Sequence, residues 1–89
     1  MQVVLTIVGK DQVGIIAKVA NALAGMNMNI ININQNIMQG FFNMVLIADM
    51  SKANVTLAQA RENMENLGKE MCLDVRLQSE DIFTAMHRI

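Results

Sequence analysis

The chain has 89 residues, enough for one small domain, and 53% of them are hydrophobic with a mean hydropathy of +0.31. Such a domain is expected to cover part of its apolar surface with another copy of itself, so we expect an oligomer. The net charge of −1 and pI near 5.6 give no basic excess of the kind that nucleic-acid-binding domains carry.

Three features of the sequence bear on where in the cell the protein is found: its apolar runs, its first residues and its cysteine content. No apolar run approaches the roughly 20 residues of a membrane span. The strand pattern begins at residue 2, with no basic region and apolar stretch before it, so no secretory leader is expected. Cys72, the only cysteine, cannot form an internal disulfide or hold a metal unaided, and we expect it to be buried. We therefore expect a cytoplasmic protein without metal or cofactor, and without nucleic-acid or membrane partners.

The first predicted strand, over residues 2–8, is aliphatic or β-branched on both faces. One face carries Val3, Leu5 and Ile7, and the other carries Val4, Thr6 and Val8. This pattern is typical of a central strand that is covered on both sides.

The segment after this strand contains two glycines, Gly9 and Gly14, at the spacing of a phosphate-binding loop. That loop continues with Lys and then Ser or Thr, but two isoleucines stand there, and Asp11 adds a negative charge. Nucleotide binding is therefore excluded. Two explanations of Gly14 stay open, a close contact between helix and strand or a small ligand that meets bare backbone amides.

A helix is predicted from about residue 13 to residue 24, with Asp11 as its cap and Gly25 at its end. Residues at spacings of three and four predict its core-facing stripe, namely Val13, Ile16, Ala20 and Leu23.

Residues 29–38 predict an edge strand, because one face is apolar and the other carries asparagines. The apolar face has Ile31, Ile33 and Ile37, and the polar face has Asn32, Asn34 and Asn36. Met38-Gln39-Gly40 predicts a short hairpin turn, in which Gly40 is free to take a positive φ. A largely apolar strand over residues 41–50 follows.

Thr56 and Gln59 form a capping-box pattern at the start of a second helix. Its apolar stripe is Leu57, Ala60, Met64, Leu67 and Met71. An alternating edge strand over residues 73–78 follows. Ser79 then predicts the cap of a short helical tail over residues 79–89, with Ile82, Phe83, Met86 and Ile89 on one side. We expect this tail to cover the exposed sheet face of its own or a partner chain.

The order of elements is β-α-β-β-α-β, and the second and fourth strands have edge character. An antiparallel sheet in the order 4-1-3-2, with both helices on one face, satisfies this pattern. The predicted fold class is α+β, a ferredoxin-like βαββαβ sandwich with an extra C-terminal helix.

Residue types discriminate among the functions of this fold. An RNA-recognition sheet needs stacking aromatics, and the chain has three phenylalanines, no tyrosine and no tryptophan. Metallochaperones and ferredoxins need at least two cysteines to bind their metals, and Cys72 is the only cysteine here. His87 is the only histidine and lies in the tail, with no nucleophile implied beside it. No catalytic constellation is present.

Three parts of the chain resemble the signature of the ACT domain family: GKDQVGIIAKV at residues 9–19, Gly25, and Asn29-Ile30. The family has the same βαββαβ order, and the resemblance implies an ACT domain over residues 1–78. The chain is most similar to short stand-alone ACT proteins of uncharacterised role, which the ending DIFTAMHRI supports. These in turn are similar to the regulator of the glycine cleavage system and to the front domain of formyltetrahydrofolate deformylases.

In this family, domains pair side by side and bind amino acids at the interface near the first loop. The resemblance implies that backbone amides beside Gly14 receive a carboxylate, that Asp11 faces an ammonium group, and that Asn29 binds either group. Asparagines of the second strand are expected to close the site from the partner. The implied ligand-binding residues are Asp11, Val13, Gly14, Ile15, Asn29, Asn32 and Asn34.

Two functions therefore remain open. The favoured hypothesis is a regulatory homodimer that binds an amino acid or a similar small zwitterion. The alternative is a ligand-free dimerisation or protein-interaction module that regulates an enzyme or a transcription factor. A small enzyme ranks last, because no paired acid, base or nucleophile is present.

Overall fold

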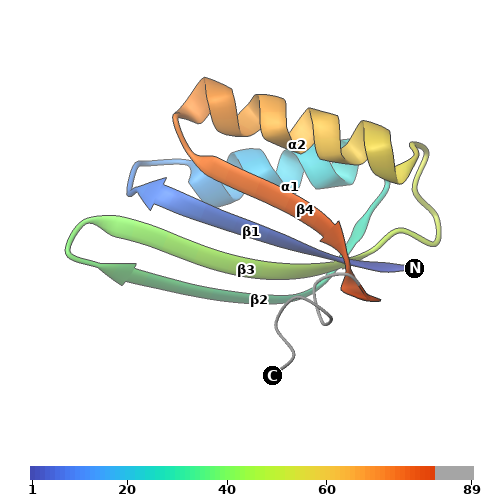
Figure 1. Cartoon of the computed structure of the whole chain (residues 1–89), viewed down its shortest axis with the longest axis horizontal. Helices are drawn as coiled ribbons and strands as arrows, with labels where there is room; N and C mark the ends of the chain where they lie inside the picture. The colour runs from blue at the N-terminus through green and yellow to red at the C-terminus, as the bar shows by residue number, and fades with distance from the viewer. Residues whose placement is uncertain (82–89) are drawn as a thin grey trace.

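The structure, a computed structural model, describes residues 1–81. Its elements are β1 (Gln2–Lys10), α1 (Ile15–Gly25), β2 (Asn29–Met38), β3 (Phe41–Asp49), α2 (Leu57–Met71) and β4 (Asp74–Ser79). The four strands form one antiparallel sheet in the order β2-β3-β1-β4, and both helices lie on the same face of it (Figure 1). The predicted ferredoxin-like βαββαβ fold and its strand order are confirmed.

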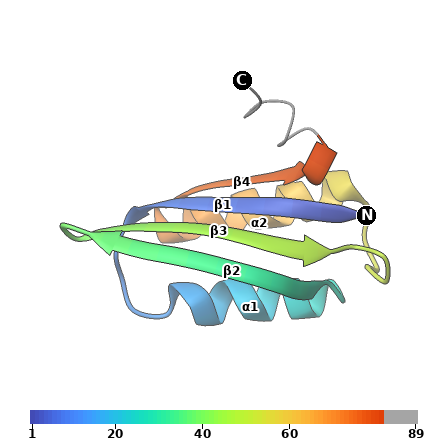
Figure 2. The same cartoon turned by 90° about the horizontal axis from the view of Figure 1, so that it is seen from below.

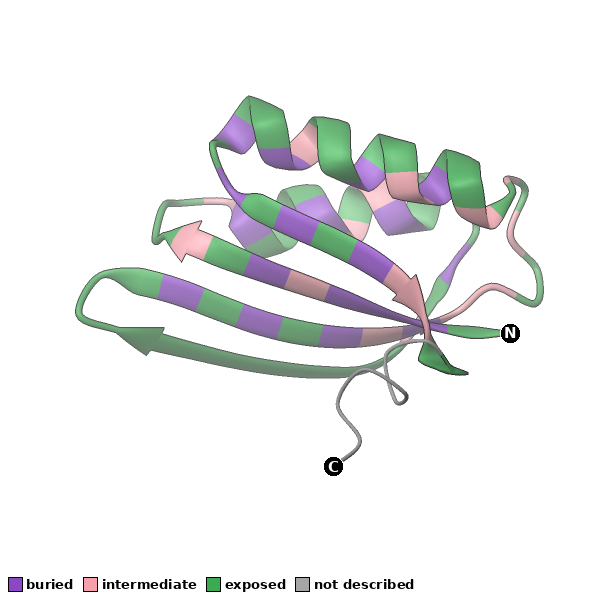
Figure 3. Ribbon diagram, viewed as in Figure 1, coloured by how far each residue is buried: buried purple, intermediate pink, exposed green. Residues whose placement is uncertain are grey.

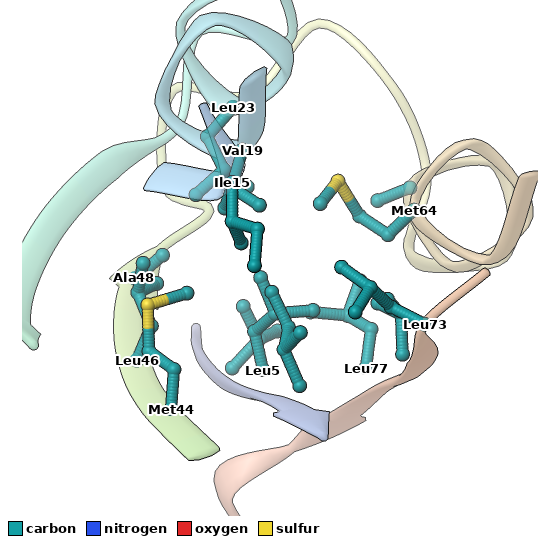
Figure 4. Packing of buried hydrophobic residues seen from close by; sticks show 14 of the residues in the cluster. Leu5, Ile15, Val19, Leu23, Met44, Leu46, Ala48, Met64, Leu73 and Leu77 are labelled. Carbon is teal, nitrogen blue, oxygen red and sulfur yellow. The ribbon is translucent and has the colours of Figure 1, made fainter. Parts of the chain in front are cut away.

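The core lies between the sheet and the helices (Figure 4). Leu5 in β1 stands opposite Leu46 in β3 and Leu77 in β4, and all three are buried. Met64 of α2 and the buried stripe of α1 close the cluster from the helix side. Burial of each such side chain contributes roughly 1.5–3 kcal/mol, so this layer holds the fold together.

The outer face of the sheet, which the helices do not cover, differs along β1. Val4 is buried there and Thr6 is half-buried, but Val8 is 45% exposed. The central position of β1 is confirmed, whereas coverage of both its faces holds only for part of the strand. Figure 2 shows the strands side by side from this outer face.

The start of α1 differs from the prediction. Gly14 is its N-cap residue, and no side chain caps the helix, so the predicted cap by Asp11 is wrong. Gly14 has a φ of +89°, which turns the chain just before the helix and leaves the side chain of Val13 fully exposed. Because the helix starts after this turn, its buried residues are Ile15, Val19 and Leu23, so Leu23 is the one member of the predicted stripe that is buried.

A non-glycine residue with positive φ follows each helix. Asn27 has a φ of 56° and Cys72 a φ of 58°, and in each case the next amide donates to the carbonyl five positions earlier. Gly25 is the last residue of α1, so Asn27 rather than Gly25 makes the turn. Cys72 is exposed, and the expectation that it is buried is wrong.

The second half of the fold follows the sequence pattern closely. The capping box is present: Gln59 N donates to Thr56 Oγ1 at 3.2 Å, and Thr56 N donates to Gln59 Oε1 at 2.9 Å. The hairpin between β2 and β3 has positive φ at Gln39 and Gly40, as a type I′ turn requires. Both predictions are confirmed.

β4 ends at Ser79, and helical backbone begins at Glu80 and Asp81. Most of the predicted tail, including the apolar side and His87, lies outside the described residues.

Candidate functional site

Two hydrogen bonds fix the first loop, which joins β1 to α1. Asp11 N donates to the carbonyl oxygen of Gly40 at 2.8 Å, and Gln12 Nε2 donates to the carbonyl oxygen of Met71 at 2.8 Å. The loop is therefore attached both to the β2–β3 turn and to the end of α2. Asp11 holds the loop through its backbone, which leaves its carboxylate for other contacts.

Gly14 allows this loop to meet the helix with its first amides uncovered. A Cβ built on Gly14 has no neighbour within 4 Å, so a close contact between helix and strand does not explain this glycine. Its φ of +89° does, because L-residues with a side chain rarely adopt that conformation. The first backbone hydrogen bond of the helix joins Lys18 N to Gly14 O at 3.0 Å. The three amides before it, from Ile15 to Ala17, have no partner within the helix and no side-chain cap.

The residues that carry these amides line a hollow of about 230 Å³, the first-loop hollow. Its wall combines the loop and the start of α1 with helix-facing residues of β2 and β3: Asp11, Gln12, Gly14, Ile15, Ile16, Ala17, Gln35, Ile37 and Phe42. Amides at a helix start attract a carboxylate, because the helix dipole adds partial positive charge there. The carboxylate of Asp11 can receive a cation, and the isoleucines and Phe42 offer an apolar surface.

The structure brings together only some of the sequence-predicted site residues. Asp11, Gly14 and Ile15 line the first-loop hollow, whereas the side chain of Val13 is fully exposed and lines no hollow. Asn29 lies at the opposite end of α1, in a second hollow of about 460 Å³. We call this the helix-end hollow; it is lined by Ala24, Asn27, Met28, Asn29, Asp49 and Lys52.

Asn32 and Asn34 lie on the outer face of the sheet. They stand opposite Ile47 and Val45 of β3, and residues directly opposite in antiparallel strands share a face. Both asparagines are exposed, and neither lines either hollow. β2 is exposed along almost its whole length, as Figure 3 shows, and it is an edge strand as predicted.

Sequence reasoning missed the residues that β2 and β3 bring to the two hollows. Gln35 and Ile37 face the helices because they stand opposite Met44 and Phe42. Their positions follow from the alternation of the strand, once the pairing register is known. Asp49 and Lys52 carry no such signal, since their place depends on how the loop after β3 meets the end of α1.

The Ser51 hydroxyl, which donates to Asp49 Oδ1 at 2.6 Å, lowers the pKa of that carboxyl below its usual range. The Ser51 amide donates to the same oxygen at 3.0 Å and acts in the same direction. Asp49 is therefore ionised at neutral pH. Across residues 1–81, no group of three or more His, Cys, Asp and Glu side chains is placed to hold a metal ion. No helix in that part of the chain is both long enough and apolar enough to cross a membrane.

Comparison with known proteins identifies the family. The sequence profile of the ACT domain matches residues 1–78. A UPF0237 protein of Methanosarcina acetivorans is 42% identical over 86 residues, which cover 97% of this chain and 94% of that protein. An ACT domain protein from Streptococcus pneumoniae has a similar structure, with a TM-score of 0.81 and 30% identity over 93% of each chain.

A formyltetrahydrofolate deformylase from Pseudomonas syringae has the same fold in part of its length. Its TM-score is 0.80 at 30% identity, and the match covers 88% of this chain but 27% of that enzyme. The likeness therefore concerns one segment of the enzyme. Sequence, fold and full-length relatives agree, and the chain belongs to the ACT domain family.

Proposed function

We propose that this protein is a regulatory ACT-domain protein that binds an amino acid as a homodimer. The observation that carries the proposal is the uncapped first turn of α1 behind Gly14, which opens on a hollow with both a carboxylate and an apolar wall. Such a combination suits a ligand with an anionic, a cationic and an apolar part.

Each group of the ligand has a partner in this arrangement. The amides of Ile15, Ile16 and Ala17 receive the ligand carboxylate. The carboxylate of Asp11 receives the ammonium group, because a charge-assisted hydrogen bond is stronger than a neutral one. Ile37 and Phe42 contact the ligand side chain.

The β2 edge is the better of the two sheet edges for pairing with a second copy. Residues 29–38 contain no charged side chain, and all except the half-buried Ile30 are exposed. The β4 edge carries Asp74 and Arg76, and Arg61 Nε donates to the Leu77 carbonyl oxygen at 3.0 Å. Charges and an occupied carbonyl hinder strand pairing, so we assign the interface to β2.

An antiparallel β2–β2 contact explains why residues at both ends of α1 belong to one site. A two-fold axis near Ile33, the middle of β2, brings the start of the partner's β2, with its Asn29, to the end of β2 that carries Ile37, beside the first-loop hollow. The contact also covers apolar side chains that one chain leaves open: Ile16 is 39% exposed, Ile33 39% and Ile37 54%. Asn32 and Asn34 then lie along the seam between the two sheets.

Isothermal titration with the twenty amino acids tests this function. We expect one or a few to bind, and we expect Gly14→Leu and Asn29→Ala to weaken binding about tenfold or more. Gly25→Ala is the matched control, because its Cβ meets nothing within 4 Å, its φ is not positive and Gly25 is not one of the proposed ligand-binding residues. If none of the twenty amino acids binds to the unmodified chain, the proposal is contradicted.

The second candidate is a dimerisation or protein-interaction module without a ligand. It is favoured by the same uncharged, exposed β2 edge, since strand pairing needs no small molecule. Two results together would support it: a partner protein co-purifies equally with and without amino acids, and titration detects no amino acid binding. In either case we place the protein in the cytoplasm and assign it regulation rather than catalysis.

A further inference from the structure

The helix-end hollow holds two opposite charges that do not pair with each other. The Asp49 carboxylate and the Lys52 ammonium both line it. No ion pair within 4 Å joins them, although residues 1–81 form other ion pairs at that cut-off. Two separated opposite charges in one hollow are complementary to a ligand that carries both signs.

Hydrogen bonds to the end of α1 fix the wall that carries Lys52. Asn27 Nδ2 donates to the backbone carbonyl oxygen of Lys52 at 2.6 Å. Asn54 N donates to Met26 O at 3.1 Å, and Asn54 Nδ2 donates to Gly25 O at 3.2 Å. The loop after β3 is therefore attached to the helix at three points. Chain segments that are already held in place lose less conformational entropy when a ligand binds between them.

The carboxylate of Asp49 is oriented, and one of its oxygens is left open. Its hydrogen bonds from the described residues, from the Ser51 amide and hydroxyl, both end on Oδ1. The Met1 ammonium also lies nearest Oδ1, at 3.8 Å. Oδ2 therefore remains for a cationic group. The carbonyl end of α1 lies at the same hollow and favours positive charge there.

We propose that the helix-end hollow is a second binding site, for the zwitterionic backbone of an α-amino acid. The ligand ammonium group donates to Asp49 Oδ2, and the ligand carboxylate accepts from Lys52 Nζ. Met28 and Ala24 supply the apolar wall next to the ligand side chain.

Within one chain, this site is separate from the first-loop hollow. The two hollows lie at opposite ends of α1, an 11-residue helix with a length of about 16 Å. All groups of the second site come from one chain, so it requires neither a dimer nor the amides beside Gly14. Its ligand need not be the amino acid that binds at the first loop.

The test is a titration of the ¹⁵N-labelled full chain with the twenty amino acids, followed through backbone amide resonances. We expect at least one to shift the amides of Asn27, Ser51 and Lys52. The N-acetyl derivative of that amino acid lacks the ammonium group, and its carboxamide lacks the carboxylate. Each derivative is expected to bind about tenfold more weakly or worse.

Asp49→Asn and Lys52→Gln are both expected to weaken binding at this hollow about tenfold or more. The asparagine oxygen can still accept from Ser51, so the loop geometry is kept. Asp74→Asn is the matched control, an exposed carboxylate on the outer face of β4. Gly14→Leu is expected to remove the response of the first turn of α1 and to leave that of the helix-end hollow.

Each of three results would contradict the proposal of a second site. They are no shift at the helix-end hollow with any of the twenty amino acids, equal shifts with the N-acetyl derivative, and an unchanged response in Asp49→Asn. If the first turn of α1 responds and the helix-end hollow does not, the proposed function stands and the second site fails. If only the helix-end hollow responds, the reverse holds.

Discussion

The amide of Asp11 donates a 2.8 Å hydrogen bond to the carbonyl oxygen of Gly40, which ties the first loop to the β2–β3 turn. Gly40 has a φ of +82°, and Gly14, three residues after Asp11, has a φ of +89°. The position of the first loop, whose Asp11 and Gly14 line the first-loop hollow, therefore depends on two turns that both have a glycine at positive φ.

Gly14→Ala is expected to destabilise the protein by about 1–2 kcal/mol, although the new methyl group meets no neighbour. The cost comes from the left-handed conformation, in which a Cβ approaches its own backbone. Urea denaturation measures it. Gly25→Ala has equally open surroundings without a positive φ, and it is expected to be neutral or to stabilise by up to about 1 kcal/mol. Equal effects of the two substitutions would contradict this explanation.

Gly68→Ala is expected to destabilise by roughly 1–3 kcal/mol, even though alanine is the better helix former. A Cβ at Gly68 would lie 2.6 Å from Val75 Cγ2 and 2.9 Å from the Leu73 carbonyl oxygen, so α2 must move away from β4. The free energy of unfolding in urea decides between the two effects. A more stable variant would show that helix propensity outweighs the contact.

The pH dependence of stability tests the environment of Asp49. Its folded-state pKa is lowered, chiefly by the Ser51 hydroxyl, from an ordinary value of 3.8. The carboxylate therefore contributes stability above pH about 4, and this is lost as the pH falls through the lower folded pKa. The stability gap between the unmodified chain and Asp49→Asn should shrink between neutral and strongly acidic pH. A gap that stays constant over this range would exclude the ionised carboxylate as its cause.

Ile33→Lys tests the assignment of the dimer interface to the β2 edge. The side chain of Ile33 is 39% exposed in one chain, so lysine is tolerated there, but it places two like charges at the two-fold axis. Sedimentation should give a dimer for the unmodified chain and a monomer for Ile33→Lys. Val8→Lys is the control, since Val8 is 45% exposed on the central strand away from this edge. A dimer that survives Ile33→Lys but not Val8→Lys would place the interface on the outer face of the sheet.

Most of the fold could be predicted because its signals are local. The capping box at Thr56 and the turn at Gly40 each depend on a few neighbouring residues, and the structure has both. The start of α1 could not be predicted, because Asp11 is a residue type that usually caps helices. In the structure the turn at Gly14, which has a positive φ, separates Asp11 from the helix, and Gly14 is the N-cap.

The candidate site was predictable only where it is formed by a continuous segment. Asp11, Gly14 and Ile15 are close in sequence and share the first-loop hollow. Asn29 is separated from them by the length of α1, and a single chain holds it in a different hollow from theirs. Alternation along β2 places Asn32 and Asn34 on one face of the strand and Gln35 and Ile37 on the other. Which of these faces is turned toward the helices depends on the pairing with β3.

The central claim is that the uncapped first turn of α1 receives the carboxylate of an amino acid. The most direct measurement is the amide chemical shift of Ile15, Ile16 and Ala17 during titration with each of the twenty amino acids. We predict saturable shifts at these amides with at least one amino acid, and their loss in Gly14→Leu. If none of the twenty moves these amides, the claim is contradicted.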